Sequence, residues 1–126
     1  MTLLKANFAV KPNKLNMMIG LARRAGKTVC GAPLVFIALR EHHKPALVLL
    51  SDGASEATKK KVTSKCAYYR VPLISVPIAT DELAKAVGKS GDLAAVAVTD
   101  DNFKKAILSA AELTGKDGTP LEAPKQ

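Results

Sequence analysis

The 126-residue chain contains no tryptophan and few aromatic side chains of any kind. A chain so poor in rings has no platform on which several bases could stack, which excludes the single-stranded RNA-binding folds built on aromatic sheets. Its core must therefore be built from Ala, Val, Leu and Ile, and a hydrophobic content of 48% is sufficient for one domain. The aromatic residues are Phe8, Phe36, Tyr68, Tyr69 and Phe103.

Cysteine and histidine are also scarce, and neither occurs at the spacing of a metal site. Cys30 and Cys66 form no C-x-x-C pair, so we expect two buried thiols in a reducing compartment rather than a disulfide or a metal site. His42 and His43 are adjacent and precede Lys44, which favours a polar helix end over a metal site. No apolar run approaches the roughly 18–20 residues of a membrane span, and residues 1–12 lack the pattern of a signal peptide. We expect a cytoplasmic protein with no membrane partner.

Motifs of catalysis are missing as well. The chain contains no phosphate-binding loop, no dinucleotide-binding glycine pattern and no nucleophile elbow. The acidic pairs at 81–82 and 100–101 stand at predicted helix starts, where the helix dipole favours them. We therefore expect no enzyme activity, no cofactor and no small-molecule substrate.

Positive charge is what the chain has in excess. Its formal net charge is +8. Residues 1–70 carry 13 Lys and Arg against 3 Asp and Glu, whereas residues 71–126 carry 6 against 8. This asymmetry favours a polyanionic partner, either nucleic acid or an anionic membrane surface. The alternative is a lysine-rich exterior that serves solubility alone.

Hydrophobic periodicity predicts helices and strands in strict alternation. The first helix is expected to open at Asn13, as its N-cap, and to end at Gly26. This alternation predicts an α/β fold, a three-layer α/β/α sandwich around a central sheet. We expect an N-terminal extension at 1–12, a single domain at 13–114 and a disordered tail at 115–126. The remaining elements are strands near 28–31, 46–50, 72–76 and 93–99, and helices near 33–42, 55–70, 81–87 and from 101 onward.

Basic residues cluster on two of the predicted helices and at the end of the first. Phosphate contacts from such side chains give affinity without choice of sequence. With so few aromatic residues, any readout must come from a helix N-terminus and from loops. The clusters are Lys59, Lys60, Lys61 and Lys65 on one helix, and Arg23, Arg24, Lys27 and Arg40 around the end of the first helix and along the second.

Three segments together resemble the L7Ae/L30e ribosomal protein family, in particular its bacterial YlxQ-type branch. They are "LARRAGKTVCGAPLVFIALR", "ALVLLSDGASEATKKKVTSKCAYYRVPLISV" and "TDELAKAVGKSGDLAAVAVTD", and the resemblance runs from residue 14 to about 108. It implies an α/β/α sandwich with a four-stranded mixed sheet. It also implies binding to structured RNA, namely kink-turn or kink-turn-like RNA, as part of a ribosome or another ribonucleoprotein.

The resemblance places the RNA contact at the turn around Gly31, at the start of the following helix and at the loop that begins near Val76. In the family this loop is apolar and packs against an unstacked nucleotide, a role that Pro77 and Ile78 fit. The alternative is that these two residues only cover the end of the sheet. The implied RNA-binding set is Lys27, Gly31, Ala32, Pro33, Leu34, Ile37, Arg40, Lys59, Lys60, Val76, Pro77, Ile78 and Ala79.

The chain departs from the family at the base-reading positions. Archaeal members carry roughly G-T-N-E-x-x-K after the glycine, and the Asn and Glu address the sheared G·A pairs of the kink-turn. Here the corresponding residues are Ala32, Pro33, Leu34 and Ile37. We therefore expect a non-catalytic RNA-binding protein with weakened kink-turn readout. Leu34 and Ile37 are expected on one helix face with Glu41, as a contact for a protein partner or a second copy of the chain, or else as core residues.

Overall fold

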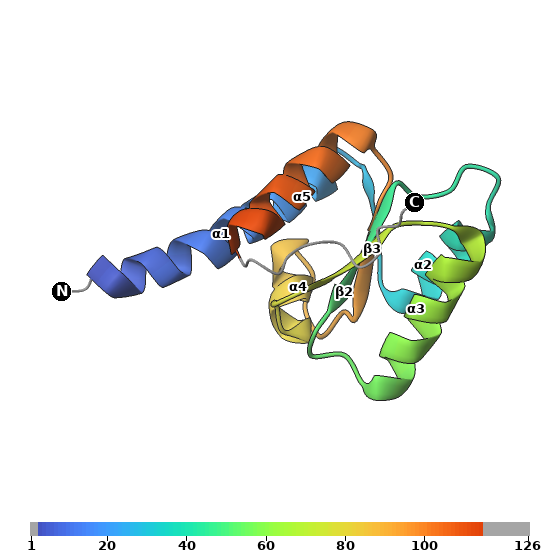
Figure 1. Cartoon of the computed structure of the whole chain (residues 1–126), viewed down its shortest axis with the longest axis horizontal. Coiled ribbons are helices and arrows are strands. Elements are labelled where there is room, and N and C mark those ends of the chain that lie inside the picture. Colours follow the sequence, from blue (N-terminus) through green and yellow to red (C-terminus); the bar gives the residue numbers. More distant parts are fainter. Residues whose placement is uncertain (1–2, 115–126) are drawn as a thin grey trace.

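The fold is taken from a computed structural model that describes residues 3–114. Five helices and four strands alternate along this part of the chain (Figure 1), which confirms the predicted order. The predicted disordered tail lies outside the described residues. The elements are α1 (Leu3–Arg24), β1 (Thr28–Cys30), α2 (Ala32–Arg40), β2 (Leu47–Ser51), α3 (Glu56–Tyr69), β3 (Leu73–Val76), α4 (Thr80–Ala86), β4 (Ala95–Val98) and α5 (Asp101–Thr114).

The four strands form one mixed sheet in the order β1-β4-β2-β3. β4 runs antiparallel to β1 and β2, whereas β2 and β3 are parallel. Every residue of β2 is buried, as expected for an apolar strand covered on both faces. The mixed, four-stranded sheet implied by the family resemblance is therefore confirmed.

Helices cover both faces of this sheet, so the three-layer sandwich is confirmed as well (Figure 1). Alternation along β2 divides the core into two clusters. Leu47 and Leu49 pack with Ile19, Leu83 and Ile107, on the face covered by α1, α4 and α5. The opposite face is covered by α2 and α3, and its buried residues include Val35, Leu39, Val48, Leu50, Val62 and Cys66.

Strand register defines two rims of the sheet, which we name by the direction of β1, β2 and β3. These three strands end at the carboxyl rim, where β4 begins, and start at the amino rim, where β4 ends. The pairs Thr28↔Val98 and Leu47↔Val98 establish this arrangement. Helices α2, α3 and α4 therefore start at the carboxyl rim, and α5 starts at the amino rim. The two rims are about 16 Å apart, the length of a five-residue strand.

The first helix starts earlier than the sequence pattern indicated. α1 begins at Leu3, so the predicted N-cap at Asn13 is wrong and Pro12 lies inside the helix. Proline removes one hydrogen bond, and the Leu, Lys and Ala residues that precede it are strong helix formers. The predicted end is confirmed. Gly26 has φ 73°, and the N–H of Lys27 donates to the carbonyl of Ala22 at 2.9 Å, which closes the helix with a left-handed turn.

The two cysteines are free thiols and belong to opposite faces of the sheet. Cys66 is buried, and burial raises the pKa of its thiol to about 12. Cys30 is half-buried, so the prediction of two buried thiols is confirmed for Cys66 and only in part for Cys30.

Arg70 ends α3 in a conformation that arginine rarely adopts. It has φ 58° and ψ 43°, and it is the only non-glycine residue with positive φ among the residues described. Its N–H donates to the carbonyl of Ala67 at 3.2 Å, and that of Val71 donates to the carbonyl of Cys66 at 2.9 Å. This is the left-handed helix ending that glycine normally occupies, so an arginine here is strained.

Replacing Arg70 with glycine should stabilise the protein. Arg70→Gly relieves the left-handed strain but adds backbone freedom to the unfolded chain, and we expect a net gain of roughly 0.5–1 kcal/mol in the free energy of unfolding. Denaturant titration measures the change. Arg70→Ala is the matched control because it removes the charge and keeps the strain. Equal stability of the two variants would contradict the assignment of strain to this residue.

Candidate nucleic-acid interface

Gly31 joins the sheet to the second helix. Its N–H donates to the carbonyl of Ala95, and its own carbonyl accepts from the N–H of Val35, both at 2.9 Å. It has φ 97° and ψ 139°, a combination that side-chain-bearing residues rarely adopt. Gly31 is also buried. The fold itself therefore requires glycine at this position, whatever approaches the helix.

The N-terminus of α2 presents backbone donors without side chains to cover them. No side chain caps this helix, and Pro33 occupies its first turn. The first N–H groups of a helix have no partner within it and carry its positive dipole end. Pro33 contributes no N–H, so Ala32 and Leu34 supply the donors before the first intrahelical bond, at Val35. Such a helix end is suited to phosphate groups and other acceptors.

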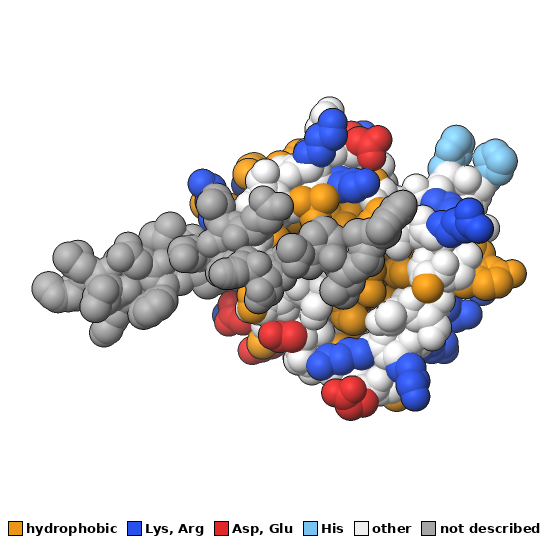
Figure 2. Space-filling model, in the orientation of Figure 1, with side chains coloured by type: hydrophobic (Ala, Val, Ile, Leu, Met, Phe, Trp, Pro, Cys, Tyr) orange, Lys and Arg blue, Asp and Glu red, His pale blue; other side chains and the backbone are white. Residues whose placement is uncertain are grey.

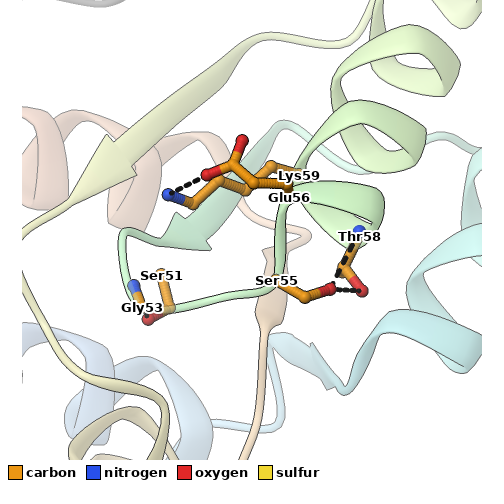
Figure 3. A network of polar contacts seen from close by, with 6 residues as sticks. All are labelled: Ser51, Gly53, Ser55, Glu56, Thr58 and Lys59. Carbon is orange, nitrogen blue, oxygen red and sulfur yellow. Dashed lines mark hydrogen bonds and ion pairs between the residues drawn. The ribbon is translucent and has the colours of Figure 1, made fainter.

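A buried serine, Ser51, ties the loop after β3 to the loop after β2. Figure 3 shows the β2 side of this link, with Ser51 beside Gly53. The Ser51 hydroxyl donates to the carbonyl of Ile78 at 2.6 Å and accepts from the N–H of Gly53 at 3.0 Å. Its side chain is completely buried. The N–H of Asp52 donates to the carbonyl of Val76 at 3.1 Å. The loop from Val76 to Ala79 is therefore held to β2 beyond the last residue of β3.

A third loop of the carboxyl rim joins the same network. The N–H of Leu93 donates to the carbonyl of Thr80, and the hydroxyl of Thr80 hydrogen-bonds the carboxylate of Asp92, both at 3.0 Å. Leu93 also lies beside Gly31, with its Cδ2 3.5 Å from the position that a Cβ on Gly31 would take. The start of α2 and the loop after β3 are thereby held at one rim.

The structure divides the predicted loop residues into two kinds. Pro77 and Ala79 are exposed. Val76 and Ile78 are core residues, with exposed fractions of 1% and 3%, so their side chains are unavailable for the predicted contact with a nucleotide. The period-two alternation of β3 continues through this loop and sends every second side chain into the core.

Leu34 and Ile37 are exposed on the outer face of α2, at 54% and 45%. The interpretation of these two residues as core is therefore wrong, because Val35 and Leu39 form the buried face instead. Leu34 lies next to the exposed Pro33 at the start of the helix, and Ile37 lies one turn further on. The outer face of α2 is thus apolar at the positions where the family resemblance implies polar base readers.

The predicted lysines of α3 begin near the carboxyl rim. Ser55 caps this helix as expected, and its hydroxyl accepts from the N–H of Thr58 at 3.2 Å. Lys59 is partly covered and pairs with the carboxylate of Glu56 at 3.7 Å, whereas Lys60 is exposed (Figure 3 shows the Lys59–Glu56 pair). Lys60 is therefore the freer of the two for contact with a phosphate.

Two predicted site residues lie at the opposite rim. The carbonyl of Lys27 accepts from the N–H of Thr99 at 2.9 Å, which places Lys27 where β4 ends. Arg40 is the last residue of α2 and also lies at the amino rim. Both are exposed. The structure thus separates Lys27 and Arg40 from Gly31 by the length of the sheet.

Other kinds of site find no support in the described part of the chain. No group of three or more His, Cys, Asp or Glu side chains within it could hold a metal ion. Among residues 3–114, no helix is sufficiently long and apolar to span a membrane.

Comparison with known proteins decides the family. The model of the Ribosomal protein L7Ae/L30e/S12e/Gadd45 family matches residues 13–108. The chain belongs to this family. The family resemblance expected from the sequence is therefore confirmed.

Individual proteins match most of the chain. The RNA-binding protein YlxQ of Bacillus subtilis (strain 168) is 42% identical over 92 residues, which is 73% of this chain and 89% of YlxQ. The RNA-binding protein YlxQ of Enterococcus faecium is 36% identical over 88 residues, 70% of this chain and 82% of that protein. A solved structure of a Bacillus halodurans protein of unknown function has a TM-score of 0.69 and 31% identity, covering 77% of this chain and 95% of the other.

Sequence reasoning overlooked Ser51, the residue that joins the loops after β2 and β3. Its one signal is position, since it is the first polar residue after the apolar run of β2. Nothing in the sequence indicates that its hydroxyl meets the carbonyl of Ile78, 27 residues further along the chain.

Removing the Ser51 hydroxyl should loosen the carboxyl rim. Ser51→Ala leaves the carbonyl of Ile78 and the N–H of Gly53 without this partner, and we expect a loss of about 1–3 kcal/mol in the free energy of unfolding. Ser75→Ala is the matched control, because Ser75 pairs with Leu50 in the sheet but is exposed. Amide hydrogen exchange should also accelerate around Gly53 in Ser51→Ala. Equal stability of the two alanine variants would contradict the role of Ser51.

Proposed function

We propose that this protein is a non-catalytic RNA-binding protein that contacts structured RNA through its carboxyl rim. The observation that carries the proposal is the juxtaposition of the uncapped N-terminus of α2 with the exposed Pro77 and Ala79, held by Gly31, Ser51 and the loop hydrogen bonds. The names of the Bacillus and Enterococcus relatives as RNA-binding proteins support it.

The chemistry of this rim suits an RNA of defined shape. Free N–H groups at the start of α2 donate to phosphate or base acceptors. Pro77 and Ala79 offer a small apolar surface on which an unstacked base can rest, as bases do in bulges and loops. A kink-turn-like RNA presents both features, a sharp backbone bend and an extruded nucleotide. We further propose that the RNA is ribosomal or belongs to another cytoplasmic ribonucleoprotein, since the family includes ribosomal proteins.

Base readout at the rim is weaker than in family members that carry the Asn and Glu readers. Ala32 and Leu34 have no side-chain hydrogen-bonding groups, so specificity rests on backbone donors and on shape. Loss of one good base contact costs about 1–3 kcal/mol of discrimination. The protein therefore binds structured RNA with limited preference for intact G·A pairs.

A second candidate function rests on the exposed face of α2. Leu34 and Ile37 together form an apolar surface, which is more typical of a contact with a protein or a second copy of the chain than of a contact with phosphates. This function is compatible with RNA binding by other parts of the rim. A double substitution distinguishes this protein contact from RNA binding. Leu34→Ala with Ile37→Ala should abolish the protein contact but leave phosphate binding unchanged.

Restoring the family readers should restore discrimination between RNAs. The graft of Ala32→Thr, Pro33→Asn, Leu34→Glu and Ile37→Lys places polar groups at positions that are exposed or half-exposed, so the fold should accept it. We expect the ratio of affinities for an intact kink-turn and for one with broken G·A pairs to rise by about 5- to 150-fold, corresponding to about 1–3 kcal/mol. Fluorescence anisotropy with both RNAs measures the ratio.

The double variant Leu34→Ala, Ile37→Ala serves as control, because it removes the aliphatic groups without adding readers and should leave the ratio unchanged. Absence of RNA binding by the natural protein at low salt would refute the proposed function. If the grafted variant binds RNA but does not distinguish intact from broken G·A pairs, the start of α2 is not the site of base recognition.

A further inference from the structure

The two rims carry opposite charge, and the rim proposed above to contact RNA is the acidic one. The carboxyl-rim segments 51–56, 77–82 and 88–95 carry five acidic residues against one basic residue. All six of these side chains are exposed, and most of the Asp and Glu side chains visible in Figure 2 lie along the lower part of the molecule. They are Asp52, Glu56, Asp81, Glu82 and Asp92, with Lys89 as the one cation within these three segments. Lys59 and Lys60 follow in the next turn of α3, where Lys59 pairs with Glu56.

The amino rim has the opposite character. Its segments 23–27, 40–46, 70–72 and 99–105 carry eight basic residues and two histidines against three acidic residues. In Figure 2 the histidines and many Lys and Arg side chains lie along the upper and right parts of the molecule, where Figure 1 shows the ends of α2 and α3 and the start of α5. The cations are Arg23, Arg24, Lys27, Arg40, Lys44, Arg70, Lys104 and Lys105, and all but the partly buried Lys104 are exposed.

The amino-rim cations are not neutralised within the protein. In the part of the chain that the structure describes, the one ion pair joins Lys59 and Glu56 on α3. Two of the three acidic residues of the rim stand at the start of α5, where Asp100 accepts from the N–H of Phe103 at 3.0 Å. Lys44 alone has structural contacts, since it donates to the carbonyls of Leu39 and Glu41 at 3.0 Å. The other cations project positive charge to solvent.

Helix dipoles account for only part of this cluster. Arg23, Arg24 and Arg40 stand in last helical turns, where cations are favourable. Lys104 and Lys105 stand near the start of α5, where cations are unfavourable. Arg70 stands in a left-handed position that glycine would occupy without strain. A residue held at an energetic cost indicates a function rather than a structural need.

We propose that the amino rim is a second RNA-contacting surface, which binds the phosphodiester backbone through charge and supplies most of the electrostatic affinity. This inference rests on the proposed RNA-binding function and adds to it. The four strand ends of the rim span about 15 Å, which is enough to meet several successive phosphates. The carboxyl rim then contributes shape readout, and the RNA or a second segment of it extends to the amino rim.

Neutralising three amino-rim cations tests the proposal. The variant Lys27→Gln, Arg40→Gln, Lys105→Gln removes exposed charges for which no structural contact is described. Binding to a kink-turn RNA and to a plain RNA duplex is measured at several salt concentrations. Each lost phosphate contact flattens the log–log salt dependence by about 0.7–0.9, so the slope should fall by about 2–3 and affinity near 0.1 M salt by roughly 100- to 500-fold. The loss should be the same for both RNAs.

The matched control is Lys14→Gln, Lys61→Gln, Lys85→Gln, which removes the same charge from exposed positions outside the segments that form the two rims. It should reduce the slope and the affinity much less. Arg70→Gly is a further variant that removes one amino-rim charge while relieving strain, so weaker binding by it cannot arise from unfolding. Equal salt slopes for the amino-rim triple and the control triple, in a protein that does bind RNA, would overturn this inference and leave the proposed function intact.

Discussion

The geometry of the carboxyl rim depends on the Ser51 hydroxyl. β2 and β3 are parallel, and their last paired residues are Ser51 and Val76. Beyond that pair, one backbone bond joins the Asp52 N–H to the Val76 carbonyl. The Ser51 side chain extends this link by joining the Ile78 carbonyl to the Gly53 N–H. All three groups belong to one short network, so the loop that presents Pro77 and Ala79 is held against the β2 end. Together with the bond from the Leu93 N–H to the Thr80 carbonyl, this network holds that loop at the same rim as the start of α2.

The same topology separates acidic from basic side chains. Helices α2, α3 and α4 start at the carboxyl rim, so their positive dipole ends point there and favour acidic side chains such as Asp81 and Glu82. Those acids repel phosphates in general, which leaves the rim suited to specific, short-range contacts. Cations collect where α1 and α2 end, at the amino rim. The proposed shape readout and the proposed long-range attraction therefore belong to opposite ends of one sheet.

Local signals predicted most of the fold, and long-range geometry limited the prediction of the site. The apolar run of β2, the glycine after α1 and the serine before α3 each act within a few residues, and each prediction was confirmed. The start of α1 was missed because one proline does not terminate a run of strong helix formers. The predicted RNA-binding set contains both Lys27 and Gly31, which are close in sequence. The strand β1 lies between them, so they are at opposite rims of the sheet.

Gly31 fits the family pattern, yet it is weaker evidence about RNA binding than Leu34 and Ile37, which depart from that pattern. Its φ of 97° and its two backbone hydrogen bonds require glycine in this fold even if RNA never approaches. Leu34 and Ile37 are under no such constraint, because both are exposed. They remain compatible with a surface that reads the shape of RNA, with backbone amides beside them in place of polar side chains.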